Sequence, residues 1–253
     1  MNDISLELAV QDIAGARIAS DVGARRVELC SALGACGGLT PSAALVEAAI
    51  DAAAVVPEAA GAPLLEVHVL IRPRAGGFVH SRDERDLMAR ETVLAVDAGA
   101  DGVVVGALRK DGTVDDDAVR ALVAAAADAE VTFHRAFDVV PDPLAALDLL
   151  AELGVTRVLT SGGAARAADG AARLAELATH SADVGIEIMA GGGVGVEDIP
   201  ALAAAGVDAI HLSARRLVSD DGGPGGGGAS GYETTDPELA RAAATAIQEL
   251  RLR

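Results

Sequence analysis

Residues 23–27 read GARRV, and the same short pattern returns as GADGV at 99–103, GVTRV at 154–158 and GVDAI at 206–210. In each copy a glycine follows a helical pattern, and a short apolar run begins a few residues later. A glycine just past a helix can adopt the left-handed conformation that closes the last turn. The pattern therefore predicts a repeated joint between a helix and the next strand, as in a chain of βα units.

Counting from these joints gives eight strands that alternate with eight helices. The predicted strands lie at about 5–10, 26–30, 65–72, 103–106, 131–135, 157–160, 186–190 and 209–213. The predicted helices lie at about 11–22, 41–55, 82–98, 114–127, 142–152, 168–180, 197–204 and 236–252, with capping signals at Asp12, Thr40, Asp142 and Asp236. This count predicts an α/β fold in which residues 1–253 form a single-domain TIM (β/α)8 barrel. The alternative is a doubly wound open sheet, which usually has a glycine fingerprint after its first strand that residues 6–15 lack.

The composition belongs to a globular protein, with 51% hydrophobic and 23% charged residues. A formal net charge of −18 argues against nucleic acid and membranes as partners, because both need basic surface. No secretory signal or membrane-spanning stretch is visible, so we expect a cytoplasmic protein. Residues 220–231 read DDGGPGGGGASG and predict a flexible glycine-rich loop after the eighth strand, either a surface insertion or a lid.

Alternation along the strands assigns side chains to the inside of the barrel. Because apolar residues should face the helices, the residues between them should face the pore. They include Glu7, Glu28, Cys30, Glu66, His68, Leu70, Arg72, Thr132, His134, Glu187, Met189, His211 and Ser213. Such a pore is unusually polar, since TIM barrels normally fill it with branched apolar side chains. Buried charges need partners, so the acids either pair with Arg72 and the histidines in a structural network or serve a site at the strand ends.

The loops after the seventh and eighth predicted strands are where TIM barrels commonly bind phosphate. Here they hold three successive glycines, whose backbone N–H groups can approach an anion, and a Ser-Ala-Arg segment. Arginines also follow the third and fifth predicted strands, and a guanidinium fits carboxylate or phosphate. An anion site is therefore predicted at the carboxyl ends of strands 3, 7 and 8. Its candidate residues are Arg72, Arg74, Arg135, Gly191, Gly192, Gly193, Ser213 and Arg215.

Candidates for general acid–base catalysis lie beside this anion site. His134 ends the fifth predicted strand, and Asp138 follows within one short loop. Glu7 and Glu28 are expected across the pore from His134. A carboxylate beside an imidazole tunes both groups for proton transfer, so these four residues are the predicted catalytic set.

The two cysteines, Cys30 and Cys36, are the predicted metal ligands. Their spacing matches no standard zinc motif. Thiolate and thioether ligands suit copper(I), and Met189 could approach the two cysteines near the barrel mouth. The alternative is an ordinary buried Cys30 and an exposed loop Cys36 with no metal role.

Several segments, in this order, resemble the CutC family, whose members are often labelled copper homeostasis proteins. They are RVELCSAL at 26–33, GLTPS at 38–42, IRPR at 71–74, ADG at 100–102, GAL at 106–108, VTFHRAFD at 131–138, RVLTSG at 157–162, GGG at 191–193 and HLSAR at 211–215. The resemblance covers most of the chain. It implies a TIM barrel, a cytoplasmic location, a homo-oligomer (dimer or tetramer) and a role in copper tolerance through copper binding.

Within the resemblance, Cys30 matches one copper-ligand candidate of the family. The other candidate, a cysteine in the first strand of some members, is replaced here by Ala9. Gly77 stands where relatives often have Asp, so any role of that acid is lost in this chain.

Two functions of different classes follow. The first is copper handling through Cys30 and Cys36, with copper(I) as the cofactor or cargo. The second is a TIM-barrel enzyme, or a non-enzymatic binder, of a small phosphorylated or carboxylated metabolite. The residues alone leave open whether the chain is an enzyme. The hard, polar character of the candidate site favours the second function.

Overall fold

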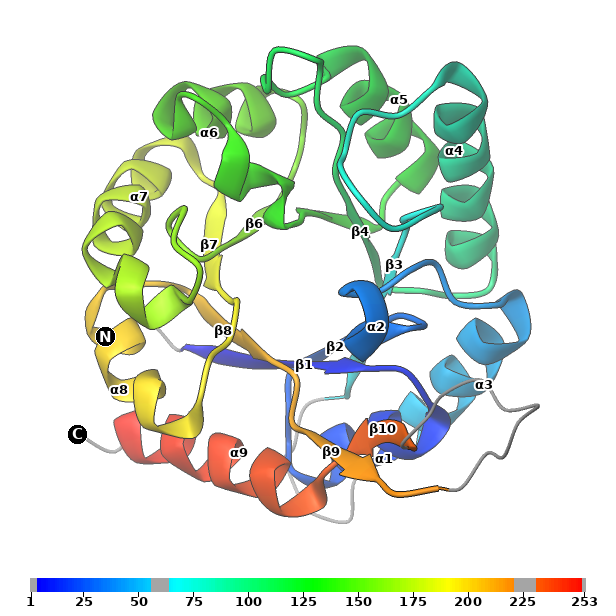
Figure 1. Ribbon diagram of the computed structural model, residues 1–253, viewed down its shortest axis with the longest axis vertical. Coiled ribbons are helices and arrows are strands. Elements are labelled where there is room, and N and C mark those ends of the chain that lie inside the picture. Colours follow the sequence, from blue (N-terminus) through cyan, green and yellow to red (C-terminus); the bar gives the residue numbers. More distant parts are fainter. Residues whose placement is uncertain (1–3, 56–63, 221–230, 252–253) are drawn as a thin grey trace.

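A computed structural model describes residues 4–55, 64–220 and 231–251. Eight parallel strands close into a barrel in sequence order, with β8 hydrogen-bonded to β1 (Figure 1). This confirms the predicted TIM barrel and excludes the open sheet. The strands are β1 (Ser5–Val10), β2 (Arg26–Leu29), β3 (Glu66–Leu70), β4 (Gly102–Val105), β5 (Glu130–Phe133), β6 (Arg157–Thr160), β7 (Glu187–Ala190) and β8 (Ala209–Leu212).

An outer ring of helices surrounds the barrel (Figure 1). The long helices are α1 (Ile13–Asp21), α3 (Ala43–Ala53), α4 (Arg82–Asp97), α5 (Asp116–Ala126), α6 (Pro143–Glu152), α7 (Ala171–Val184) and α9 (Pro237–Arg251), and α8 (Ile199–Ala204) is shorter. Short 3-10 turns occur at η1 (Arg135–Val139), η2 (Ala167–Gly170) and η3 (Val196–Asp198). Each predicted helix is present, with ends that differ by a few residues.

Three of the four predicted helix caps are confirmed. Asp12, Asp142 and Asp236 each accept a backbone N–H from the first turn of the helix that follows. Thr40 was the wrong choice for α3, because Ser42 caps that helix instead. The Thr40 hydroxyl accepts a hydrogen bond from the backbone N–H of Arg72 and donates one to Glu91, so it joins the ends of two βα units.

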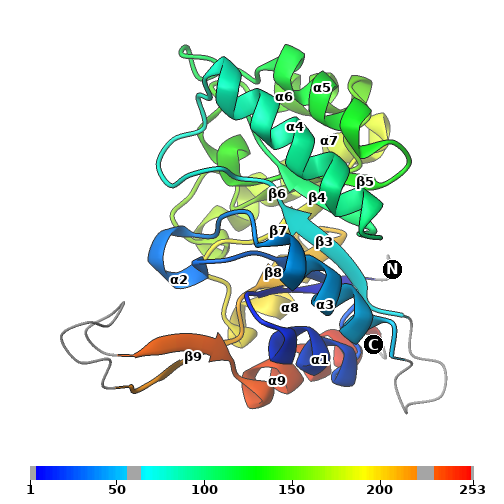
Figure 2. The same ribbon diagram turned by 90° about the vertical axis from the view of Figure 1, so that its right-hand side faces the viewer.

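The sequence did not predict a one-turn helix, α2 (Leu33–Cys36), or an antiparallel hairpin formed by β9 (Arg215–Val218) and β10 (Tyr232–Thr235). Figure 2 shows α2 and the hairpin at the end of the barrel opposite the two chain termini. The hairpin flanks the predicted loop at 220–231, of which residues 221–230 lie outside the described part of the chain. Gln11 donates to the Glu233 carbonyl at 2.7 Å and so attaches the hairpin to the loop after β1.

The main hydrophobic core lies between the strands and the helix ring. Leu6, Leu8, Val27 and Leu29 belong to this core, as their alternation predicted. The inside of the barrel is different, because buried charged and polar side chains fill much of it. They are Glu7, Arg26, Glu28, His68, Thr132, His134 and Arg157. Buried charges are stable only when they are paired, so their contacts decide what the barrel can do.

Candidate functional site

Glu7, inside β1, joins two cationic groups. Its carboxylate lies 2.7 Å from His211 Nδ1 and 2.8 Å from Arg26 Nε, and the side chain is 1% exposed. Burial alone would raise the pKa of Glu7, but the contacts with His211 and Arg26 lower it overall. The same hydrogen bond raises the pKa of His211 against the effect of burial. Glu7 is therefore an ionised carboxylate that orients the His211 ring and favours its protonated form.

Glu28, inside β2, lies on the other side of the His211 ring. Its carboxylate is 3.9 Å from His211 Nε2, and the residue is 5% exposed. Burial raises the pKa of Glu28 to about 7, and the nearby His211 charge only partly opposes this. A carboxyl group with a pKa near neutrality can both take up and release a proton, as general acid–base catalysis requires.

His134, directly after β5, is held as a neutral imidazole. Its Nδ1 accepts the backbone N–H of Ala136 at 3.1 Å, so the ring proton is assigned to Nε2. Burial, with a contribution from Arg72, lowers the pKa of His134 to about 3. At neutral pH this residue is suited to donate a hydrogen bond, whereas the sequence suggested a group that gains and loses a proton.

Asp138 orients the arginine that precedes it. Its carboxylate lies 2.7 Å from Arg135 Nε and also accepts the Thr160 hydroxyl at 2.6 Å and the Ser161 N–H at 2.9 Å. Arg135 reaches the Ser161 hydroxyl as well, at 3.1 Å. The Arg135 side chain is still 41% exposed, so its charge is accessible from the barrel mouth. Asp138 thus connects the β5 and β6 loops, and its carboxylate accepts hydrogen bonds from several donors.

One cavity brings the predicted groups together at the carboxyl ends of the strands. It has a volume of about 120 Å³ and an apolar wall that includes Leu70, Phe78 and Leu159. Two predicted catalytic residues, Glu28 and His134, line this cavity. Two predicted anion-binding residues, Arg72 and Arg135, line it as well, together with His211. His211 was predicted to face the pore but was not among the predicted site residues.

Glycines make room for these side chains. A Cβ at Gly106 would overlap the His134 ring, and one at Gly192 would lie 2.8 Å from Arg135 Cζ. A Cβ at Gly191 would lie 3.2 Å from His211. The run from Gly191 to Gly193 was predicted to cradle an anion through its backbone. Its first two members also give the His211 and Arg135 side chains the space that they occupy.

Other predicted anion-binding residues have structural partners elsewhere. Arg74 binds Glu84 and the carbonyl groups of its own loop. Arg215 lies on the hairpin and pairs with Glu233 at 2.9 Å. Ser213 is half-buried and is not among the described residues that line the mouth cavity. Arg135 is therefore the exposed arginine of the mouth.

Arg72 does not pair with the buried acids, which corrects one expectation from the sequence. Its Nη1 donates to the carbonyl groups of Cys36 and Gly38, at 2.8 and 3.0 Å, and its Nη2 donates to Gly76 at 2.9 Å. The guanidinium also lies over Phe78, with Cζ 5.4 Å from the ring centroid. Arg72 therefore organises two loops of the mouth while remaining part of the cavity wall.

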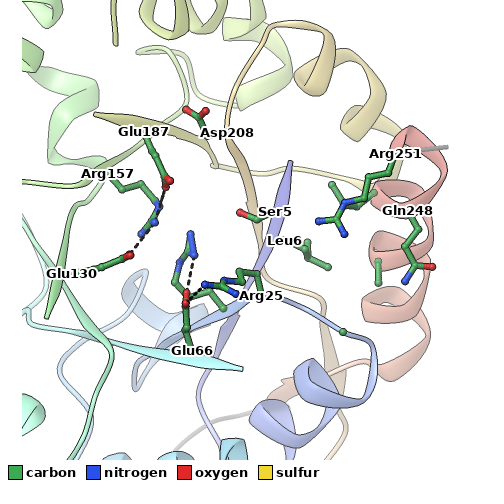
Figure 3. Close-up of a pocket in the computed structure, with 14 residues that line it drawn as sticks. Ser5, Leu6, Arg25, Glu66, Glu130, Arg157, Glu187, Asp208, Gln248 and Arg251 are labelled. Carbon is green, nitrogen blue, oxygen red and sulfur yellow. Dashed lines mark hydrogen bonds and ion pairs between the residues drawn. The ribbon is translucent and has the colours of Figure 1, made fainter. Parts of the chain in front are cut away.

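The acids at the amino-terminal end of the barrel pair with arginines that the sequence analysis did not place in the pore. Figure 3 shows Arg157 between Glu130 and Glu187, with Arg25 beside Glu66. Glu66 also pairs with Arg26 at 3.2 Å. These residues line a second cavity of about 450 Å³. Each of these acids is paired with an arginine, so this end of the barrel is a structural network.

The cysteines do not form a ready copper site. The Cys30 thiol is fully buried, faces the Val10 carbonyl at 3.5 Å and has a pKa raised well above its usual value, chiefly by burial. Cys36 Sγ faces the Ala32 carbonyl at 3.4 Å. Met189 packs with Leu159 and not in the small core around Cys30.

In the described residues, three or more His, Cys, Asp or Glu ligand atoms lie within reach of one ion at one place, Asp115 to Asp117. This group contains no cysteine and lies at the start of α5. The described residues therefore show no such centre of three or more ligands around a cysteine, and copper(I) binding through Cys30 and Cys36 stays a prediction.

Among the described residues, no helix has the length and apolar character to cross a membrane. The model of the CutC family matches residues 4–216. Family protein CutC of Pasteurella multocida is 38% identical over 213 residues, which cover 84% of this chain and 82% of that relative. Family protein CutC of Xanthomonas campestris pv. campestris (strain 8004) is 44% identical over 217 residues, 85% of either chain.

Solved structures give the same assignment. The CutC protein of Streptococcus agalactiae has a provisional copper-homeostasis name. Its structure is 30% identical in sequence, with a TM-score of 0.75, and the match covers 82% of this chain and 97% of that protein's chain. Thiamine phosphate pyrophosphorylase of Pyrococcus furiosus is 12% identical with a TM-score of 0.61, and covers 98% of both chains, which shows the barrel fold alone. By its sequence and its fold, the chain belongs to the CutC family.

Proposed function

We propose that this chain binds a small carboxylated or phosphorylated metabolite at the mouth of the barrel and acts on it as an acid–base enzyme. One observation carries the proposal: Arg135, Arg72 and the His211 imidazolium converge with Glu28 and His134 on a single cavity. The carboxyl end of a TIM barrel is where its catalytic residues normally lie. In a chain with a net charge of −18, this cavity is a local concentration of cationic groups.

The size of the cavity limits the ligand. Its volume of about 120 Å³ corresponds to about four water molecules, at about 30 Å³ each. A three- or four-carbon acid has that size, and a longer substrate would extend past Arg135 into solvent. Arg135 supplies the accessible charge for a carboxylate or phosphate, and Asp138 holds its guanidinium in place.

The acid–base part of the proposal rests on Glu28 and His211. Glu28 and the His211 imidazolium share a face of the cavity, and Glu7 holds the imidazole ring from behind. This pairing gives one group that exchanges a proton near neutral pH and one cation that stabilises negative charge. The cytoplasmic location and the homo-oligomer stay predictions of the family resemblance.

A ligand panel tests the proposal. Three- and four-carbon carboxylates and phosphate monoesters are titrated by calorimetry against the wild type, Arg135→Gln and, as a matched control, Arg90→Gln at an exposed position of α4. We expect at least one anion to bind and Arg135→Gln to weaken it by about 10-fold or more, because a charge-assisted hydrogen bond is lost. Arg90→Gln should bind as the wild type does.

The copper alternative is tested on the same protein. The reduced chain and Cys30→Ser are titrated with copper(I) against a strong chelator. If no anion binds, and tight stoichiometric copper binding disappears in Cys30→Ser, the metabolite proposal is wrong and copper handling replaces it. Weak copper binding that the substitution leaves unchanged agrees with the proposal.

A further inference from the structure

Two hydrogen-bond donors of the mouth cavity have no partner in the described part of the chain. They are His134 Nε2 and Arg72 Nε, both buried atoms. Their residues are 6% and 8% exposed, and both residues line the cavity. An unpaired buried donor is costly, and in native proteins such groups call for an explanation such as a ligand or a catalytic role.

The other contacts of each side chain hold these donors in place. The Ala136 N–H occupies His134 Nδ1, which leaves the proton on Nε2. Carbonyl groups accept hydrogen bonds from both terminal nitrogens of Arg72, which leaves Nε as its one nitrogen without a partner in the described part of the chain. Because burial keeps His134 neutral, this side chain offers a hydrogen bond without offering a proton.

Phe78 covers both donors. Its ring centroid lies 4.8 Å from that of His134 and 5.4 Å from Arg72 Cζ. Phe78 is itself half-buried and follows Gly76 and Gly77, and a Cβ at Gly77 would meet nothing within 4 Å. Phe78 therefore packs against both donor side chains and forms part of the cavity wall beside them.

We infer that His134 Nε2–H and Arg72 Nε–H bind the carbonyl oxygen of a small anionic ketone or aldehyde, and that Glu28 moves a proton at the carbon next to that carbonyl. The inference deepens the proposed function and rests on it. Glu28 is the carboxyl group of the cavity wall, and it has no arginine partner among the described ion pairs. Hydrogen-bond donors that face a carbonyl oxygen, one on the neutral His134 ring and one on the Arg72 guanidinium, stabilise the negative charge that develops there.

The proposed step balances without a co-reactant. The Glu28 carboxylate takes the hydrogen from the carbon next to the carbonyl, and the C–H electron pair becomes the carbon–carbon double bond of an enolate. The carbonyl π pair moves to the oxygen, which the two N–H groups stabilise. Return of a proton to the same carbon exchanges the hydrogen of that carbon or inverts its configuration. Where that carbon carries a hydroxyl group, protonation at the former carbonyl carbon, with transfer of the hydroxyl proton to the former carbonyl oxygen, moves the carbonyl to the neighbouring carbon and isomerises the substrate.

Proton exchange in D2O tests this step. The probes are 2-ketobutyrate, which carries a carboxylate, and dihydroxyacetone phosphate, which carries a phosphate, and the loss of their C–H signals next to the carbonyl is followed by proton NMR. We expect the wild type to exchange at least one probe, and comparison of the two shows which anion the mouth accepts. Glu28→Gln should lower the exchange rate by about 100-fold or more.

Further variants distinguish the loss of the His134 hydrogen-bond donor from a loss of the folded structure. His134→Ala should lower the rate by about 100-fold, and His134→Gln, which keeps an N–H donor, should retain part of it. The matched controls Glu176→Gln and His180→Ala lie on the outer surface of α7 and should exchange at the wild-type rate. Because every variant is purified in the same way, a contaminating isomerase would appear in all of them.

Binding of the same probes is measured in parallel with proton exchange, from the thermal stabilisation that each probe gives the protein. A probe that stabilises the wild type but does not exchange overturns the enolisation step and leaves the proposed function standing. Exchange that persists in Glu28→Gln overturns the assignment of Glu28. Failure of every anion in the wider ligand panel to bind overturns the proposed function, and the inference with it.

Discussion

At the scale of single residues, glycines decide where the chemical groups can lie. Gly106, directly after β4, does not adopt a left-handed backbone conformation, so an alanine there causes no backbone strain. The alanine Cβ would, however, overlap the His134 ring. We predict that Gly106→Ala displaces His134, lowers the free energy of unfolding by about 1–3 kcal/mol through overpacking and weakens ligand binding. Urea unfolding and the thermal shift with the bound anion measure the two effects.

Gly77 offers the matched control. It also lies outside the left-handed region, and a Cβ there would meet nothing within 4 Å. Gly77→Ala should change the free energy of unfolding by no more than about 0.5 kcal/mol. If Gly106→Ala and Gly77→Ala changed the free energy of unfolding equally, the proposal that Gly106 makes room for the His134 ring would be wrong.

Strand alternation predicted much of the candidate site from the sequence. It put Glu7, Glu28, His134 and His211 inside the barrel, where the structure has them. The sequence could not show that His134 has a backbone donor on Nδ1, because that contact depends on the η1 turn. It also could not show that the glycines of the mouth clear space for side chains from neighbouring strands.

At the scale of elements, the two arginines at the start of β2, Arg25 directly before the strand and Arg26 as its first residue, have opposite environments. Arg26 is 3% exposed and pairs with the buried Glu7, whereas the Arg25 side chain is 49% exposed, and both contact Glu66. We predict that Arg26→Met lowers the free energy of unfolding by about 3 kcal/mol, because it leaves the buried Glu7 carboxylate with His211 as its one remaining cationic partner. Arg25→Met should cost less than about 1 kcal/mol, as exposed pairs do. Urea unfolding of both variants makes the comparison.

Arg26 lies in the variable part of the GARRV joint, so the repeated pattern did not single it out. Its spacing of two residues from Glu28 places both side chains on the pore side of β2. Arg157 lies at the same point of the GVTRV joint. The β9–β10 hairpin was missed for a different reason. Its two strands have four residues each and are separated by the glycine-rich segment, so neither has a recognisable period.

At the scale of the whole molecule, the polar interior makes stability depend on pH. Mainly through burial, the pKa of both His68 and His134 falls from 6.5 to about 3, so unfolding below pH 6.5 lets each take up a proton. Glu28 acts in the opposite direction, since its pKa rises from 4.5 to about 7 and it releases a proton on unfolding between these values. His211 has a raised pKa, so its contribution is complete below pH 6.5 and is lost only as pH rises through the folded value.

Between about pH 6.5 and 5, His68 and His134 each gain a proton on unfolding, His80 adds to this uptake because burial also lowers its pKa, and Glu28 loses a proton, so the net uptake is at least about one proton. We therefore predict that the free energy of unfolding falls by at least about 1.4 kcal/mol for each unit that the pH decreases. His134→Gln removes one of the gains and should make the slope smaller. Glu28→Gln removes the opposing loss and should make the slope steeper. Urea unfolding at several pH values measures all three slopes, and equal slopes in the two variants would show that neither group titrates as the buried interior requires.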